Sequence, residues 1–137
     1  MVLVKLPILL LITAEPEFVY LIKRYGEWSG CRVISNSGVD EALAAIIRER
    51  PAMVFLHLLW GSEGGWSSLR RLKQHAATCG IPITIISSVA DEARARAEGA
   101  DYWLWQPVMY ADFRVALVAT HALPAAAGEE TDRGGSD

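Results

Sequence analysis

The residue with the clearest chemical potential is His57, which lies in the apolar run Met53–Leu59 with the sequence MVFLHLL. An imidazole that ends a buried strand could accept a phosphoryl group, or could act as a pH switch, because histidine changes charge between about pH 5 and 8. It could instead be a neutral, hydrogen-bonded packing residue, as most buried polar groups are. We favour the packing interpretation, because no cation nearby in the sequence would neutralise a phosphate.

Other chemistry-bearing patterns are weak. The segment Gly61–Gly65, with the sequence GSEGG, lacks both GxGxxG and GK[ST], so we interpret it as a turn rather than a phosphate cradle. Cys31 and Cys79 stand far apart without a CxxC pattern, which favours two reduced thiols over a metal site. Because no nucleophile–base pair and no metal cluster is evident, we expect neither an enzyme nor a bound cofactor or metal.

Composition favours one soluble domain. The chain has 137 residues, of which 52% are hydrophobic and 21% charged, enough for a single full core. A net charge of −3 and the absence of a basic run argue against nucleic-acid binding. The apolar stretch Pro7–Ala14 is too short to span a membrane, so we expect a cytoplasmic protein. The polar tail Pro124–Asp137 is expected to be disordered, which leaves residues 1–123 as the folded domain.

The elements that would position His57 alternate along the chain. Apolar runs predict strands at Ile8–Ile12, Arg32–Ser35, Met53–Leu59, Ile81–Ile86 and Tyr102–Trp105. Helical spacing of apolar residues predicts helices at Glu17–Trp28, Asp40–Arg50, Gly65–His75, Asp91–Glu98 and Ala111–Leu123. This alternation predicts an α/β fold in which a doubly wound, five-stranded parallel sheet has helices on both faces. The length fits the flavodoxin-like strand order 2-1-3-4-5.

Two predicted helices show which side chains we expect on their apolar faces. In Asp40–Arg50 the apolar residues at helical spacing include Ile46 and Ile47. In Ala111–Leu123 they include Phe113 and Val115.

Several local patterns, in the right order, resemble the receiver domains of two-component response regulators. They are PILLITAEPEF, SNSGVDEALAAIIRERPAMVFLHLLW, IPITIISS and EGADYWLWQPV, together with Gly65 eight residues after His57. The resemblance covers about Pro7 to Leu123. It implies a crevice at the carboxyl ends of the strands, where receivers hold Mg²⁺ with an acidic pair and phosphorylate an aspartate. A Ser or Thr and a lysine there contact the phosphoryl group.

Residue by residue, this sequence departs from the receiver pattern. The resemblance places the acidic pair at Thr13 and Ala14, with Glu15 beside them. It places the phosphoacceptor at His57 and the lysine at Gln106, and only Ser87 keeps a receiver-type group. No aspartate lies between positions 51 and 88, so a shift in register does not restore the acceptor. The resemblance therefore implies a degenerate receiver, a pseudo-receiver that lacks the phosphoacceptor aspartate.

The last predicted strand carries two possible interface residues, Trp103 and Trp105. In receivers the position of Trp103 holds an aromatic that swings inward or outward, and an outward Trp103 would be a candidate interface anchor, because Trp is enriched at binding hot spots. The segment from Ser87 to Gly99 is about three residues shorter than in most receivers, which shortens the fourth helix by nearly a turn. The usual receiver dimer and output face, which includes that helix, is therefore open to question.

Two functional hypotheses follow. The first is a signalling module that binds a sensor kinase, an output protein or a second copy of itself through the surface around Trp103. This binding would not depend on phosphorylation, and we expect neither nucleic acid nor a membrane as a partner. The alternative is a small-molecule or pH sensor that uses the vacated crevice, which is bordered by Thr13, His57, Gly61–Gly65, Ser87 and Gln106.

Overall fold

A five-stranded parallel sheet forms the centre of the computed structural model, which describes residues 5–58, 63–88 and 92–124. The strands are β1 (Ile8–Ile12), β2 (Arg32–Asn36), β3 (Met53–His57), β4 (Ile83–Ser87) and β5 (Tyr102–Trp105). Their order across the sheet is β2-β1-β3-β4-β5, and every neighbouring pair is parallel. The predicted flavodoxin-like order 2-1-3-4-5 is confirmed.

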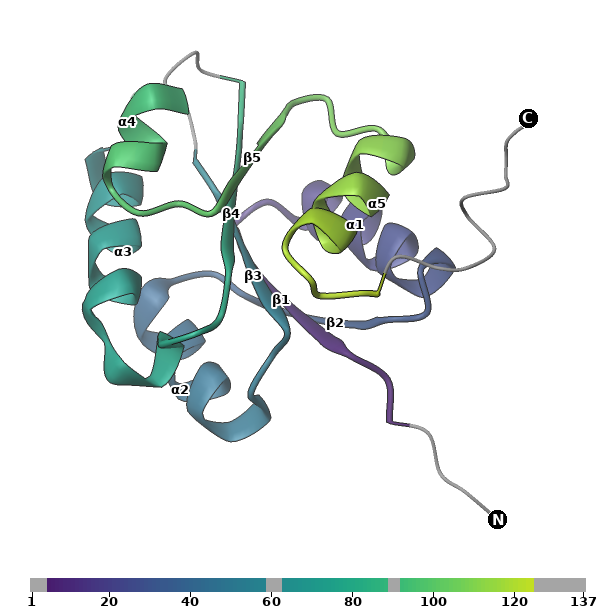
Figure 1. Ribbon diagram of the computed structural model, residues 1–137, viewed down its shortest axis with the longest axis horizontal. Helices are drawn as coiled ribbons and strands as arrows, with labels where there is room; N and C mark the ends of the chain where they lie inside the picture. The colour runs from purple at the N-terminus through teal and green to yellow at the C-terminus, as the bar shows by residue number, and fades with distance from the viewer. Residues whose placement is uncertain (1–4, 59–62, 89–91, 125–137) are drawn as a thin grey trace.

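Helices cover both faces of this sheet. They are α1 (Pro16–Trp28), α2 (Val39–Glu49), α3 (Glu63–Gln74), α4 (Glu92–Ala97) and α5 (Tyr110–Ala119), with a short 3₁₀ turn, η1, at Ala76–Thr78. Figure 1 shows α2, α3 and α4 on one side of the sheet and α1 and α5 on the other. Each strand except the last leads into a helix that returns the chain to start the next parallel strand, which is why the carboxyl ends of all five strands meet at one edge.

Two apolar cores, one on each face, explain why the central strands have no polar alternation. Strands β1, β3 and β4 are buried at every position, because helices cover both of their faces. Leu10, Leu56 and Ile85 point into the core beneath α2, α3 and α4. The other core lies beneath α1 and α5 and contains Phe55 and Phe113, whose stacked rings lie 5.3 Å apart.

The boundaries of some elements differ from the prediction. Strand β3 ends at His57, and Leu59 lies outside the described residues. Strand β4 starts at Ile83, two residues later than predicted. Helix α5 ends at Ala119 rather than Leu123, because the chain turns at His121, whose φ is 65°. Residue 91, where the fourth helix was expected to start, and residues 125–137 of the predicted tail also lie outside the described residues.

Two side chains predicted to lie on apolar helix faces are exposed instead. Ile47 is 57% exposed and Val115 is 54% exposed, whereas Ile46 and Phe113 are fully buried. Successive residues are separated by about 100° around a helix, so one of two adjacent apolar residues commonly falls outside the buried stripe.

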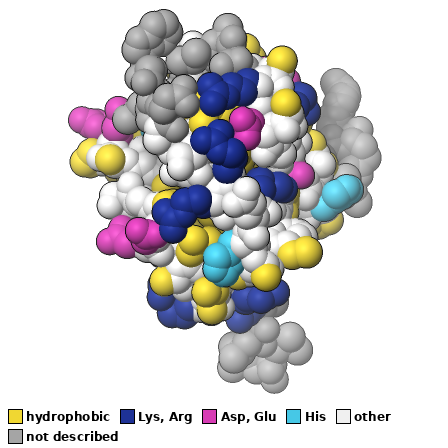
Figure 2. Space-filling view, turned by 90° about the vertical axis from the view of Figure 1, so that its left-hand side faces the viewer, with side chains coloured by type: hydrophobic (Ala, Val, Ile, Leu, Met, Phe, Trp, Pro, Cys, Tyr) yellow, Lys and Arg dark blue, Asp and Glu magenta, His cyan; other side chains and the backbone are white. Residues whose placement is uncertain are grey.

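The face formed by α3 and α4 carries charges of both signs. Arg70 and Arg94 each contact Glu98, at 3.3 and 3.8 Å, and Arg96 contacts Glu92 at 2.7 Å. Figure 2 shows Lys and Arg side chains interspersed with acidic ones on this side of the molecule. Among the described residues, no helix has the length and apolar character needed to cross a membrane.

Candidate functional site

The predicted site lies where β1, β3, β4 and β5 end. Thr13 follows β1 directly, and its N–H donates to the carbonyl of Asn36 at 3.0 Å, so the chain stays aligned with β2. His57 and Ser87 are the last residues of β3 and β4, and Gln106 follows β5. Parallel pairing therefore brings together residues that are up to 93 positions apart, from Thr13 to Gln106.

A hydrogen-bonded network centred on His57 connects three of these strand ends. Its Nδ1 lies 2.8 Å from Thr13 Oγ1, and its Nε2 lies 3.0 Å from Gln106 Oε1. Because an amide oxygen can only accept, the imidazole donates from Nε2 to Gln106. In the neutral tautomer that carries its proton on Nε2, Nδ1 accepts the Thr13 hydroxyl proton. This arrangement fits a neutral imidazole with both ring nitrogens satisfied inside the protein.

Packing holds the His57 ring in place as well. The ring stacks on Phe18, with centroids 4.3 Å apart, and His57 is only 7% exposed. Phe18 belongs to the first turn of α1, so the helix that follows β1 contributes to the site. The sequence predicts a helix that includes Phe18 but does not connect this residue to His57, because the contact depends on how α1 crosses β3.

Not every predicted site residue joins the network. Thr13 accepts an additional hydrogen bond from the N–H of Glu15 at 3.2 Å, which fixes the turn after β1. Ala14 and Glu15 themselves are exposed at this turn. Ser87 is fully buried, and its carbonyl accepts the N–H of Gln106 at 3.0 Å. The structure therefore brings together Thr13, His57 and Gln106 as side chains.

The chemical character of the network is neutral. It consists of one hydroxyl, one imidazole and one carboxamide, without a carboxylate or a cation. In the ranges 5–58, 63–88 and 92–124, no three His, Cys, Asp or Glu side chains gather in a way that could hold a metal ion. The network links the ends of β1, β3 and β5 by hydrogen bonds, but it supplies no charge to stabilise a phosphoryl group.

Two shallow hollows flank the end of β1. One, of about 260 Å³, lies beside His57 and is also lined by Ser37, Gly65 and Ser68. The other, of about 320 Å³, lies between the end of β1 and the end of β2. The first is smaller than most ligand pockets, which span roughly 300–1,000 Å³. Of the predicted turn Gly61–Gly65, residues 61 and 62 lie outside the described residues, and residues 63–65 form the start of α3 rather than a turn, so this part of the prediction is wrong.

Trp103 and Trp105 differ sharply in exposure. Trp103 is only 6% exposed and packs in the core beneath α3 and α4, so it is not the outward interface anchor considered from the sequence. Trp105 lies edge-on to it, with ring centroids 5.5 Å apart, and is 48% exposed. Both side chains point to the same face of the sheet, but Trp105 stands at the strand end, where the core no longer covers it.

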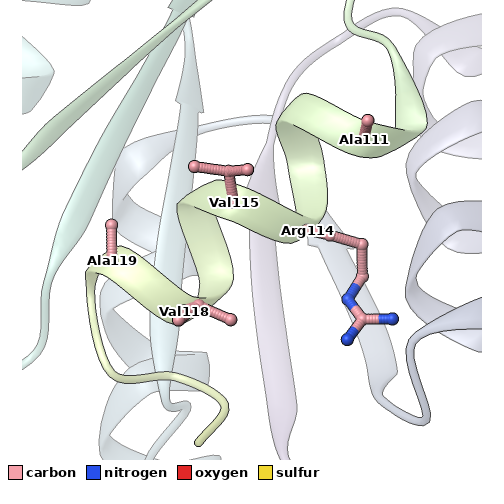
Figure 3. A pocket seen from close by; sticks show the side chains of 5 residues that line it. All are labelled: Ala111, Arg114, Val115, Val118 and Ala119. Carbon is pink, nitrogen blue, oxygen red and sulfur yellow. The ribbon is translucent and has the colours of Figure 1, made fainter. Parts of the chain in front are cut away.

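An apolar hollow runs along the surface of α5. It has a volume of about 480 Å³ and is lined by Ala111, Arg114, Val115, Val118 and Ala119. Figure 3 shows Ala111, Val115 and Ala119 along one side of the helix, whereas Arg114 points away toward α1. A smaller hollow of about 210 Å³ follows the outer side of β5 and includes Val115 and Asp112. Helix α5 therefore has apolar residues on its exposed side as well as on its buried side.

The two cysteines lie in different environments. Burial raises the pKa of the Cys31 thiol, and the positive charge of Arg114 partly offsets this rise. Cys79 is exposed and directly follows the 3₁₀ turn η1. Neither belongs to the network around His57.

This sheet order, with helices on both faces and polar side chains at the carboxyl ends of the strands, is the fold of receiver domains. No protein-family model matches the chain. Among solved structures, the chemotaxis protein CheY4 of Vibrio cholerae has a TM-score of 0.75 at 16% identity, with 87% of this chain and 100% of that chain covered. The receiver domain of sensor histidine kinase PA1611 from Pseudomonas aeruginosa, with magnesium in its active-site cleft, has a TM-score of 0.72 at 18% identity, covering 83% and 96% of the two chains.

Sequence comparison gives two curated relatives, both from Pseudomonas aeruginosa. The chain is 28% identical to protein PilG over 81 residues, which are 57% of this chain and 60% of PilG. It is 23% identical to protein PilH over 103 residues, which are 73% of this chain and 85% of PilH. The match thus spans less than two thirds of PilG. At these identities, the comparisons establish the receiver fold.

Proposed function

We propose that this chain is a signalling domain of the receiver type that acts through protein–protein interaction without being phosphorylated and without catalysing a reaction. The observation that supports this most directly is the state of His57. The fold places it at the end of β3, where the receiver pattern has the phosphoacceptor, and its two ring nitrogens are already bonded to Thr13 and Gln106.

The neutral character of the site supports the same proposal. Phosphoryl transfer needs a metal or other cations to balance the developing negative charge. The position of the receiver lysine carries Gln106, and the position of the acidic pair carries Thr13 and Ala14. Glu15, the nearest carboxylate in the sequence, is exposed on the turn and takes no part in the network through its side chain.

The surface suited to a protein partner lies around β5 and α5. Trp105 and Val115 are half-exposed there, beside two apolar hollows. Large apolar side chains in such hollows are typical of interface centres. A partner that binds this face could be a sensor kinase, an output protein or a second copy. The sensor alternative has weaker support, because the hollow beside His57 is small and the ring has no free nitrogen to offer a ligand.

A thermal-shift experiment tests the absence of phosphorylation. The melting temperature is measured with and without Mg²⁺ plus beryllofluoride, which mimics an aspartyl phosphate. We expect no shift, because a ligand stabilises a protein only when it binds the folded state. A receiver domain with a complete acidic set, measured in parallel, provides the positive control.

Labelling with radioactive acetyl phosphate gives an independent readout. We expect no incorporation into the chain. An Mg²⁺-dependent rise in melting temperature with beryllofluoride, or stable incorporation of the radioactive label into the chain, would mean that a working phosphoacceptor is present. Either result would show that the proposal is wrong. Acid-labile label that disappears in His57→Gln would identify a phosphohistidine and would also contradict the proposal.

A further inference from the structure

Helix α5 carries apolar side chains on its exposed side as well as on its buried side. Phe113 and Leu117 are buried against the sheet, as expected for a helix of this fold. Ala111, Val115 and Ala119 follow one another at intervals of four residues along the exposed side, as Figure 3 shows. A helix that is apolar around its circumference is normally covered on both sides. The outer side of α5 is therefore suited to a covering segment.

The hollow on this outer side has a defined order of apolar and charged groups. Its volume is about 480 Å³, and Arg114 is the cation among the described residues that line it. Val118 and Ala119 form its apolar end, at the last turn of the helix. Asp112 is exposed in the first turn, where it lines the smaller hollow along β5. From its last turn to its first, the outer side of α5 is therefore apolar, then positive, then negative.

The chain leaves α5 in a direction that favours a return along the helix. After the helix ends, the N–H groups of Ala122 and Leu123 both donate to the Leu117 carbonyl, at 2.9 and 3.1 Å. The backbone therefore turns back toward the helix instead of continuing along its axis. Pro124, the last residue that the structure describes, is exposed. Residues 125–137 thus begin beside the last turn of α5.

Residues 125–137 are numerous enough to run along the whole helix. Helix α5 has 10 residues, so it is about 15 Å long at 1.5 Å per residue. An extended chain covers roughly 3.3 Å per residue, so residues 125–130 alone reach roughly 20 Å. A path from Pro124 back to Ala111, at the first turn of the helix, is therefore within the reach of this segment.

The first residues of the segment suit the apolar end of the hollow. Residues 125–127 are three alanines, whose methyl groups are small enough to fit over Val118 and Ala119. Three methyl groups bury little apolar area, so this contact is weak by itself. Because the segment is tethered beside the hollow, however, its effective concentration there is on the order of millimolar, which populates even a weak contact.

The charges of the segment complement those of α5 when the two run antiparallel. Glu129 and Glu130 follow the alanines and come level with Arg114. Arg133 comes next and reaches the level of Asp112, in the first turn of the helix. Opposite charges therefore meet at two places along the path, and each exposed pair adds a modest attraction that salt weakens.

We infer that residues 125–137 of this chain dock antiparallel on the outer side of α5, with the three alanines in the hollow and Glu129 and Glu130 beside Arg114. Another protein has to displace this segment before it can use the same surface. The segment therefore controls access to the partner-binding face around α5. This regulatory consequence rests on the proposed function, whereas the docking itself does not depend on it.

Paramagnetic relaxation enhancement in the full chain tests the docking. A nitroxide spin label is attached at Thr131→Cys in a Cys79→Ser background, because the remaining cysteine is buried. The methyl signals of Val115 and Val118 are expected to lose most of their intensity. The methyl signals of Ile47 should keep theirs, because α2 lies on the opposite face of the sheet from α5, as Figure 1 shows.

A matched pair of variants separates docking from simple proximity, since the tether alone also brings the label near the end of α5. Glu129→Gln with Glu130→Gln removes two carboxylates at unchanged length and is expected to restore most of the Val115 signal. Gly134→Lys with Ser136→Lys raises the net charge by the same two units but keeps both carboxylates, so the signal loss should persist. Circular dichroism confirms that each variant is folded.

Three outcomes overturn the inference. The first is the absence of signal loss at Val115 and Val118, and the second is a loss that is equal with and without the two carboxylates. The third is a loss that appears when a spin-labelled chain is mixed with an isotope-labelled chain that has no spin label, because the segment then docks on another copy. None of these outcomes alters the beryllofluoride and acetyl phosphate tests of the proposed function, so the two proposals fail separately.

Discussion

At the residue scale, His57 shows how a polar side chain is accommodated at the end of a fully buried strand. Its hydrogen bonds to Thr13 and Gln106 satisfy both nitrogens, and Phe18 covers one face of its ring. A buried polar group with partners costs little, whereas loss of one partner leaves the other unsatisfied. The network therefore stabilises the join between β1, β3 and β5, and each of its members should depend on the others.

Removing the Thr13 hydroxyl tests this dependence. Thr13→Val keeps the side-chain shape but leaves His57 Nδ1 without a donor, so we expect a loss of about 1–2 kcal/mol in the free energy of unfolding. Gln106→Met should lose about 0.5–1 kcal/mol, because Gln106 is only half-buried and water can replace it. Urea unfolding measures both.

The double variant and a control complete the test. Thr13→Val with Gln106→Met should deviate from additivity by about 0.5 kcal/mol or more, because both residues bond to the same ring. Ser88→Ala, at an exposed position next to the site, should change stability by less than about 0.5 kcal/mol. If Thr13→Val were no more destabilising than Ser88→Ala, the network would not contribute to stability.

At the element scale, helix α2 ends at a residue in a strained conformation. Arg50 has φ 52° and ψ 62°, in the left-handed region, and its N–H donates to the Ile46 carbonyl at 2.9 Å. Pro51 follows and prevents the helix from continuing. Glycine is the usual residue at such a helix end, because it has no Cβ to clash with the backbone. An arginine in this conformation lowers the stability of the chain. Among the described residues, its side chain makes no hydrogen bond or ion pair that would compensate.

Arg50→Gly should therefore stabilise the chain. We expect a gain of about 0.5 kcal/mol, since relief of left-handed strain outweighs the flexibility that glycine adds to the unfolded chain. Arg48→Gly is the matched control, two residues earlier and still inside α2, and should lose about 1 kcal/mol. Thermal unfolding of both variants distinguishes a conformational effect from loss of a positive charge, which would act in the same direction in both.

At the scale of the whole molecule, the two cores differ in what they connect. The core beneath α1 and α5 ties the last helix to the central strand β3 through the stacked rings of Phe55 and Phe113. Phe113 is fully buried, whereas Val115, two residues further on, is 54% exposed on the opposite side of α5. Packing and interface contact can therefore be separated on one helix.

Phe113→Ala is expected to destabilise the fold by about 3–5 kcal/mol, because it leaves a cavity between α5 and β3. Val115→Ala should change the stability of the monomer by less than about 0.5 kcal/mol. Denaturant unfolding at low protein concentration, followed by circular dichroism, checks both. Equal losses in the two variants would mean that the exposed side of α5 is packed within the monomer.

The sequence was sufficient for the order of elements and the strand order of the sheet, because both depend on local patterns. Continuous apolar runs such as Ile8–Ile12 and Met53–His57 suit strands covered on two faces, and the helices between them require parallel connections. Helix ends were less predictable. Helix α5 stops four residues early because the turn at His121 depends on the local backbone rather than on hydrophobic spacing.

The tertiary structure alone decided the contacts of the site and the exposure of its neighbours. His57 meets Thr13 and Gln106 across 44 and 49 positions of sequence, and these distances close only because β1, β3 and β5 end at one edge. Trp103 and Trp105 are both tryptophans and lie on the same face of strand β5, so no sequence pattern predicts which of them is buried. One lies over the core and the other beyond it, since burial depends on where neighbouring elements end in space.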